Sequence, residues 1–149
     1  MRVDLDKYRE AGRIASQARR RAAAAVRPGV RYVDVLDGIE DYIRSCGAEL
    51  AFPAQVSVNN IAAHDCCGPG DPRTFKLGDV AKVDLGVHID GCIADTAETV
   101  DLGDHATLLE ASRQALEAAI ALVRPGAHTR DLGCEPLRPE SEVLATFGE

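Results

Sequence analysis

The chain has 149 residues, enough for one ordinary domain with a buried core. Apolar residues make up 46% of it and the formal net charge is −7, which disfavours nucleic acid and anionic membrane as main partners. One local exception to the acidic character, Arg19-Arg20-Arg21, is assigned to the solvated side of a helix. No apolar run approaches the roughly 20 residues that span a bilayer, and the N-terminus lacks the apolar segment of a signal peptide.

The cysteines bear on the cellular compartment. There are five, an odd number, and none shows the C-x-x-C spacing of a metal or redox motif. Reduced thiols in a cytoplasmic protein are the simplest account. The adjacent Cys66-Cys67 could hold a metal or form a redox pair, but the pattern favours ordinary loop residues.

Two helices are predicted at the start of the chain. The first is expected over residues 4–26, capped by Asp4 or Asp6 and stopped by Arg27-Pro28-Gly29. The second is expected over residues 32–47, because its apolar residues recur at intervals of three and four until a glycine ends the pattern.

Strand and loop signals follow the two helices. Residues 49–58 read as a strand that Pro53 interrupts, which indicates an edge strand or a bulge. Residues 59–74 contain several glycines and prolines and are expected to form a loop. A further helix is predicted from about His105 to Val123.

Residues 80–100 predict a β-hairpin. Two runs of alternating apolar and polar residues flank Asp90-Gly91, a dipeptide that favours a two-residue type I′ turn. Counting outward from this turn pairs Gly86 with Asp95 and Asp84 with Ala97. Asp84 and Asp95 therefore share one face as diagonal neighbours, with backbones roughly 7–8 Å apart.

This pair of carboxylates suggests a metal site. Gly86 has no side chain, so the space between Asp84 and Asp95 is expected to be empty. Carboxylate oxygens in this arrangement suit two divalent ions about 3.5–4 Å apart. The alternative is a solvated hairpin face, on which aspartate is common.

The last predicted helix repeats the first. Gln17, Ala18, Ala22, Ala24 and Val26-Arg27-Pro28-Gly29 match Gln114, Ala115, Ala119, Ala121 and Val123-Arg124-Pro125-Gly126, always 97 residues later. This indicates a duplicated unit whose second copy has just begun. Two prolines, Pro136 and Pro139, then occupy positions where the second copy should be helical. The tail over residues 134–149 is expected to be unrelated to the repeat, through either a frameshift or natural divergence.

Two continuous stretches carry a family resemblance: FPAQVSVNNIAAH, and GPGDPRTFKLGDVAKVDLGVHIDGCIADTAETVDLG. Together they closely resemble the type II methionine aminopeptidases in their short archaeal form, over residues 3–133. The resemblance implies an α/β (α+β) pita-bread fold, present as the first duplicated half plus the start of the second. Residues 1–133 are then the amino-terminal part of that domain, and residues 134–149 a tail that does not match.

The resemblance also implies an activity and a set of site residues. The family removes the initiator methionine from nascent proteins, using two divalent metal ions discussed as cobalt, manganese, iron or zinc. By the motif, Asp84 and Asp95 are the first two of five metal ligands, and His64 contacts the substrate near the scissile bond. Phe52 falls near the wall of the methionine pocket. The resemblance further implies that the enzyme is cytoplasmic, that it works close to the ribosome, and that it is a monomer at full length.

The remaining ligands of the family pattern, one histidine and two glutamates, belong to the second copy. Neither His105 nor His128 matches that histidine, no glutamate of the tail is nominated, and no residue is assigned as catalytic. The chain is therefore expected to bind metal weakly and to be inactive alone. Two alternatives stay open: an X-Pro dipeptidase-like member of the same fold, and a non-catalytic pita-bread binding module.

Overall fold

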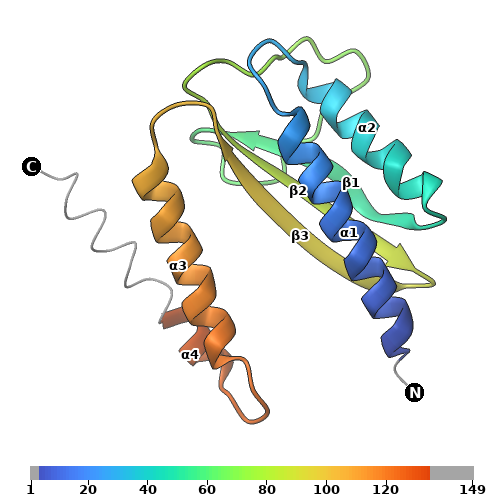
Figure 1. The fold of residues 1–149 in the computed structure, drawn as a ribbon, viewed down its shortest axis with the longest axis vertical. Helices are drawn as coiled ribbons and strands as arrows, with labels where there is room; N and C mark the ends of the chain where they lie inside the picture. Colours follow the sequence, from blue (N-terminus) through green and yellow to red (C-terminus); the bar gives the residue numbers. More distant parts are fainter. Residues whose placement is uncertain (1–3, 135–149) are drawn as a thin grey trace, which may run out of the picture. The chain divides into compact units, whose positions relative to one another are not determined.

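The computed structural model describes residues 4–134, and the chain divides into two compact units, Met1–Gly103 and Asp104–Glu149. Each unit is described by itself. The elements of the first are α1 (Leu5–Ala25), α2 (Tyr32–Ser45), β1 (Glu49–Val58), β2 (Val80–Ile89) and β3 (Cys92–Asp101) (Figure 1). Those of the second are α3 (Ala106–Leu122) and α4 (Thr129–Cys134). Among residues 4–134, no helix has the length and apolar character needed to cross a bilayer.

Both N-terminal helices are confirmed, with local signals at their ends. The Asp4 carboxylate accepts a hydrogen bond from the Lys7 N–H at 3.3 Å, so Asp4 rather than Asp6 caps α1. The chain leaves α1 in extended geometry at Val26, and it leaves α2 through Gly47, whose φ of +75° suits glycine.

The three strands form one antiparallel sheet in the order β1-β2-β3. Asp90 and Gly91 have φ values of +48° and +81°, as a type I′ turn requires. The predicted hairpin register is confirmed, including the pairing of Gly86 with Asp95. β1 lies at the edge, and its register shifts on both sides of Phe52, the second shift spanning Pro53. The prediction that Pro53 marks an edge strand or a bulge is therefore confirmed, and β1 shows both.

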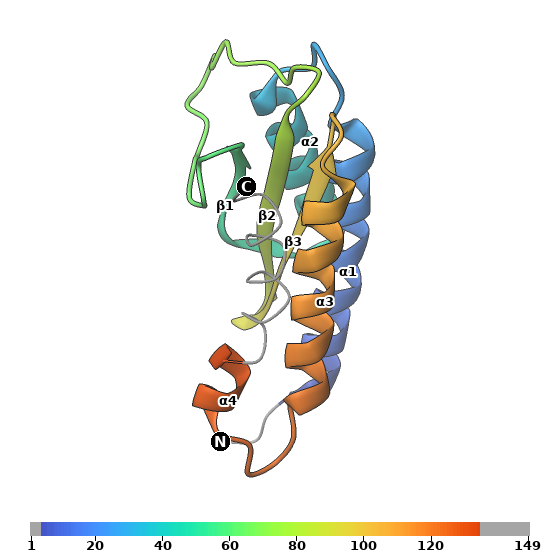
Figure 2. The same cartoon turned by 90° about the vertical axis from the view of Figure 1, so that its left-hand side faces the viewer.

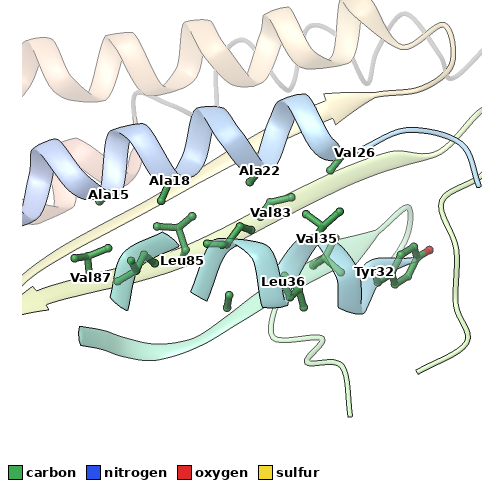
Figure 3. Packing of buried hydrophobic residues seen from close by; sticks show 14 of the residues in the cluster. Ala15, Ala18, Ala22, Val26, Tyr32, Val35, Leu36, Val83, Leu85 and Val87 are labelled. Atoms are coloured by element: carbon green, nitrogen blue, oxygen red, sulfur yellow. The ribbon is translucent and has the colours of Figure 1, made fainter. Parts of the chain in front are cut away.

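The core of the first unit lies on one face of the sheet, under α1 and α2 (Figure 2). Every second residue of β2 points into it. Alanines of α1 let this helix approach the strands closely, and α2 contributes larger apolar side chains (Figure 3). The fully buried members on β2 are Ala81, Val83, Leu85 and Val87, each at 0% exposure. The intervening residues of β2 must face the other way, toward the side that these helices do not cover.

The second unit confirms the repeat at its start. α3 ends at Leu122 and α4 begins at Thr129, positions that match the end of α1 and the start of α2. Gly126 has a φ of +86° where Gly29 has +87°. The expectations for Pro136, Pro139 and the tail from 135 onward lie outside the described residues.

Candidate functional site

Two carboxylates lie on the face of the sheet turned away from α1 and α2. Asp84 stands on β2 opposite Ala97, and Asp95 stands on β3 opposite Gly86. Directly opposed residues point to the same side, so the two aspartates share a face with Gly86 between them. Asp84 is partly buried, whereas Asp95 is exposed. The hairpin thus places the two predicted metal ligands together.

The electrostatics of Asp84 connect it with the other predicted site residues. Burial raises the pKa of the Asp84 carboxyl, and the neighbouring charge of Asp95 raises it further, while His64 partly offsets both effects. The charges of Asp95 and His64 therefore both act on the Asp84 carboxyl. Within residues 4–134, neither aspartate forms a hydrogen bond or an ion pair, so the repulsion between the two carboxylates is offset only in part, by His64.

Such a donor set fits a divalent cation. Carboxylate oxygens are hard ligands, and a cation between two carboxylates would relieve their mutual repulsion. No group of three or more histidine, cysteine, aspartate or glutamate side chains in the described part of the chain is arranged to hold a metal ion. Asp84 and Asp95 consequently supply only part of a coordination sphere.

The space over Gly86 is not empty, contrary to the sequence-based expectation. A Cβ atom added at Gly86 would lie 2.4 Å from Cε1 of Phe52 and 2.9 Å from Cβ of Ala51. The irregular register of β1 brings Phe52 directly opposite Gly86, so its ring packs against the glycine. Gly86 is thus needed for close packing, and an apolar ring lies beside the two carboxylates.

Replacing Gly86 with alanine is expected to lower the free energy of unfolding by about 1–3 kcal/mol, because Phe52 and Ala51 must move. Urea unfolding followed by circular dichroism measures the change. Gly38→Ala is the matched control, since Gly38 lies in α2 with nothing within 4 Å of the added methyl. Alanine should stabilise that helix by about 0.5–1 kcal/mol. Equal effects at the two positions would contradict the packing role of Gly86.

The loop that carries His64 is anchored immediately after it. His64 is exposed and has a φ of +65°, an uncommon conformation for a residue with a side chain. The next residue, Asp65, accepts a backbone hydrogen bond from Val56 at 3.1 Å, and its own N–H donates to Oγ of Ser57 at 3.4 Å. The loop is thereby fixed to β1 at the base of the histidine.

Arg73 completes this anchor. Its guanidinium donates to the carboxylates of Asp65 and Asp71, with shortest distances of 2.6 and 2.7 Å. Hydrogen bonds from Arg73 lower the pKa of Asp71 to about 2. This cluster was not predicted, although two aspartates and an arginine within nine residues of a Gly/Pro-rich loop were a visible signal.

Two nearby groups, the Cys66-Cys67 pair and His88, do not join the site. Burial raises the pKa of Cys67 to about 11, with a further contribution from Asp71, so its thiol stays protonated at neutral pH. This agrees with the assignment of Cys66-Cys67 to an ordinary loop. His88 lies with Nε2 3.3 Å from a carboxylate oxygen of Glu49, and its Nδ1 accepts the N–H of Gly91. It therefore braces the turn of the hairpin, away from Asp84.

Residues 6–136 match metallopeptidase family M24, and these residues include both aspartates and His64. The chain belongs to this family. A methionine aminopeptidase from Archaeoglobus fulgidus is 48% identical over 128 residues, which are 86% of this chain and 44% of the relative. The chain thus spans about half the length of the curated relatives it matches.

Solved structures confirm the α/β pita-bread fold of the family M24 enzymes. The methionine aminopeptidase from Rickettsia prowazekii superposes with a TM-score of 0.84 at 26% identity, covering 94% of this chain and 60% of that one. The proline aminopeptidase P II from Yersinia pestis gives a TM-score of 0.86 at 22% identity, covering 97% and 34%. At that identity the second likeness concerns the fold alone. Membership of M24 also implies divalent metal ions, in agreement with the two carboxylates.

Proposed function

We propose that this chain forms the first half of a methionyl aminopeptidase, which hydrolyses the peptide bond after an N-terminal methionine. The observation that carries the proposal is the pair Asp84 and Asp95, which flanks a glycine on the open face of the hairpin and has no hydrogen-bond or ion-pair partner among the described residues. The name shared by relatives such as the 48% identical A. fulgidus protein supports the substrate. We propose nascent proteins in the cytoplasm, close to the ribosome, as its substrates.

In this proposal the residues of the chain have separate roles. Asp84 and Asp95 would hold the metal ions, with manganese, cobalt, iron and zinc as the candidates. When bound, such ions supply a water of lowered pKa and polarise the scissile carbonyl. Phe52, packed on Gly86, offers an apolar surface to the methionine side chain. His64 would hydrogen-bond the substrate near the scissile bond, held there by the anchor at Asp65.

The two alternatives have less support. The assignment as an X-Pro enzyme is supported by structures such as that of the Y. pestis protein, and at 22% identity this likeness concerns only the fold. A non-catalytic module would be expected to lose metal ligands, whereas both aspartates of the hairpin are present. The histidine and the two glutamates that the family pattern adds to the metal site are expected from a second half.

Metal binding is the first test of this site. Calorimetry with Mn²⁺ or Co²⁺ should show weak binding to the 149-residue chain, because two carboxylates supply only part of a coordination sphere. Asp95→Ala should abolish the signal. Asp41→Ala is the matched control, since the Asp41 side chain is 83% exposed on α2, and it should bind as the wild type does. Binding that survives Asp95→Ala would contradict the assignment of the ligands.

Substrate class is tested by completing the fold. The chain alone should release no methionine from a Met-Ala-Ser peptide with Mn²⁺ or Co²⁺. Residues 1–133 joined to the second half of the A. fulgidus relative should release it, and Asp84→Ala in this chimera should abolish turnover. Cleavage of X-Pro peptides instead would favour the dipeptidase alternative. A folded, metal-binding chimera that cleaves neither peptide would favour the binding module.

A further inference from the structure

The point at which the chain leaves β1 is held by hydrogen bonds to the start of β2. Asn59 directly follows β1 and has a φ of +56°, a left-handed conformation that asparagine tolerates better than most residues. Its backbone N–H donates to the carbonyl of Val80 at 2.9 Å, and its side-chain Oδ1 accepts the N–H of Val80, also at 2.9 Å. The side chain therefore takes the place of a backbone carbonyl, so pairing with β2 continues where the chain has already turned away.

The other polar groups of Asn59 bind in the same region. Its Nδ2 donates to Oδ1 of Asp79 at 3.0 Å, and its carbonyl accepts from Nζ of Lys82 at 3.2 Å. Asp79 is buried, and its backbone carbonyl accepts the N–H of Leu102 at 2.8 Å, just after β3. The hydrogen bonds from Asn59 to Asp79, Val80 and Lys82 form a clip, the Asn59 clip. This clip ties the exit from β1 to the hairpin that carries the two carboxylates.

His64 lies on a short segment, residues 60–64, between this clip and the anchor at Asp65. Both ends of the segment are tied to the sheet, the first through Asn59 and the second through the bonds of Asp65 to β1. The φ of +65° at His64 is costly, and such a conformation persists only where the surrounding structure determines it. The charge of His64 acts on Asp84, so the segment brings the imidazole toward the carboxylates.

We propose that Asn59 is a positioning residue, which together with the anchor at Asp65 fixes where His64 lies relative to Asp84. The proposal rests on the proposed role of His64 at the scissile bond. Asn59 need not touch the substrate itself. A segment attached only at Asp65 could pivot about that end, whereas a second attachment sets its direction. Groups held in position before the substrate arrives lose less freedom on binding and meet the reacting atoms in a productive geometry.

The chemistry of the clip explains why asparagine suits position 59. The amide accepts through its oxygen from Val80 and donates through its nitrogen to Asp79. Glycine takes the same φ but has no side chain to form the clip. Aspartate could accept from Val80, but it would place a second carboxylate against that of Asp79. If the clip served only to close the ends of the strands, its loss would leave His64 undisturbed, and this difference can be measured.

NMR relaxation of the full 149-residue chain tests the positioning of His64. In the wild type, the order parameter of the His64 backbone amide should be about 0.85, and in Asn59→Gly it should fall below about 0.6. Asn60→Gly is the matched control, because Asn60 is the exposed neighbour and its side chain forms no hydrogen bond within residues 4–134. This control should keep the wild-type value, with circular dichroism showing that both variants are folded.

Exchanging the two partners of the clip gives a rescue experiment. Asn59→Asp alone sets two carboxylates against each other and should loosen His64. Adding Asp79→Asn restores one donor and one acceptor, because the amide at position 79 can donate to position 59 while its oxygen still accepts the N–H of Lys76. The double variant should recover the order parameter of the wild type. An ordered His64 in Asn59→Gly, or a double variant no more ordered than Asn59→Asp, would overturn the proposal.

Turnover by the chimera with the second half of the A. fulgidus relative links this order to catalysis. Asn59→Gly should lower kcat roughly 10–100-fold and leave KM nearly unchanged, since a misplaced His64 affects the reacting geometry more than binding. Asn60→Gly should leave both constants unchanged. An active chimera whose kcat is insensitive to a mobile His64 would overturn the positioning role. A wild-type chimera without activity would count against the proposed function, while the order parameters would still decide whether Asn59 holds His64.

Discussion

Replacing Leu85 with alanine is expected to lower the free energy of unfolding by about 2–5 kcal/mol, the largest effect of the substitutions considered. Leu85 lies at the centre of β2, the strand that also carries Asp84, and its side chain is buried under the helices with 0% exposure. Removing its side chain leaves a cavity that close-packed neighbours cannot fill. Because the adjacent Asp84 depends on the position of this strand, the same variant should also weaken metal binding.

Leu77→Ala is the control for this experiment. Leu77 is 84% exposed in the loop before β2, so the same chemical change should alter the free energy of unfolding by less than about 0.5 kcal/mol. Urea titration of both variants gives the comparison. Equal midpoints for the two variants would show that the sheet does not pack as described.

Asp84→Asn is expected to stabilise the metal-free chain near pH 7 and to abolish metal binding. Burial and then Asp95 raise the pKa of Asp84 above its ordinary 3.8, so the folded chain binds this proton more readily than the unfolded chain. The free energy of unfolding therefore falls as the pH rises from 3.8 through the raised pKa. Asparagine carries no charge, so the variant should be more stable than the wild type above this window and equal to it below.

Thermal melts at pH 3 and pH 7, each with and without Mn²⁺, check this result. Mn²⁺ should raise the melting temperature of the wild type and leave that of Asp84→Asn unchanged, because only the wild type retains both carboxylates. Asp41→Asn, exposed on α2, should follow the wild type throughout. A variant less stable than the wild type at pH 7 would show that the Asp84 carboxylate has a stabilising partner.

Local patterns predicted most of the first unit correctly. The Asp90-Gly91 turn determined the register of the hairpin, and this register placed Asp84 and Asp95 on one face. Helix ends followed from caps and glycines, because these signals act over a few residues. The repeated Val-Arg-Pro-Gly sequence likewise marked two matching turns, confirmed by the φ values of Gly29 and Gly126, which differ by only 1°.

The errors and omissions involve contacts between distant segments. Phe52 reaches Gly86 because β1 changes register around Pro53, and a count of residues cannot show how a bulge redirects a side chain. The anchor of Arg73 depends in the same way on how a long loop returns to β1. Neither contact follows a periodic pattern, so both had to be found in three dimensions.

The composition of the core has a consequence for the order of folding. Within the described residues, its buried cluster and the apolar residues packed against it end at Leu102, so the first unit completes its interior without residues 104–134. During synthesis, residues 4–103 can therefore reach their final structure while the remainder of the chain is still being made. A folded amino-terminal unit would then be the surface on which the rest of a longer family member assembles.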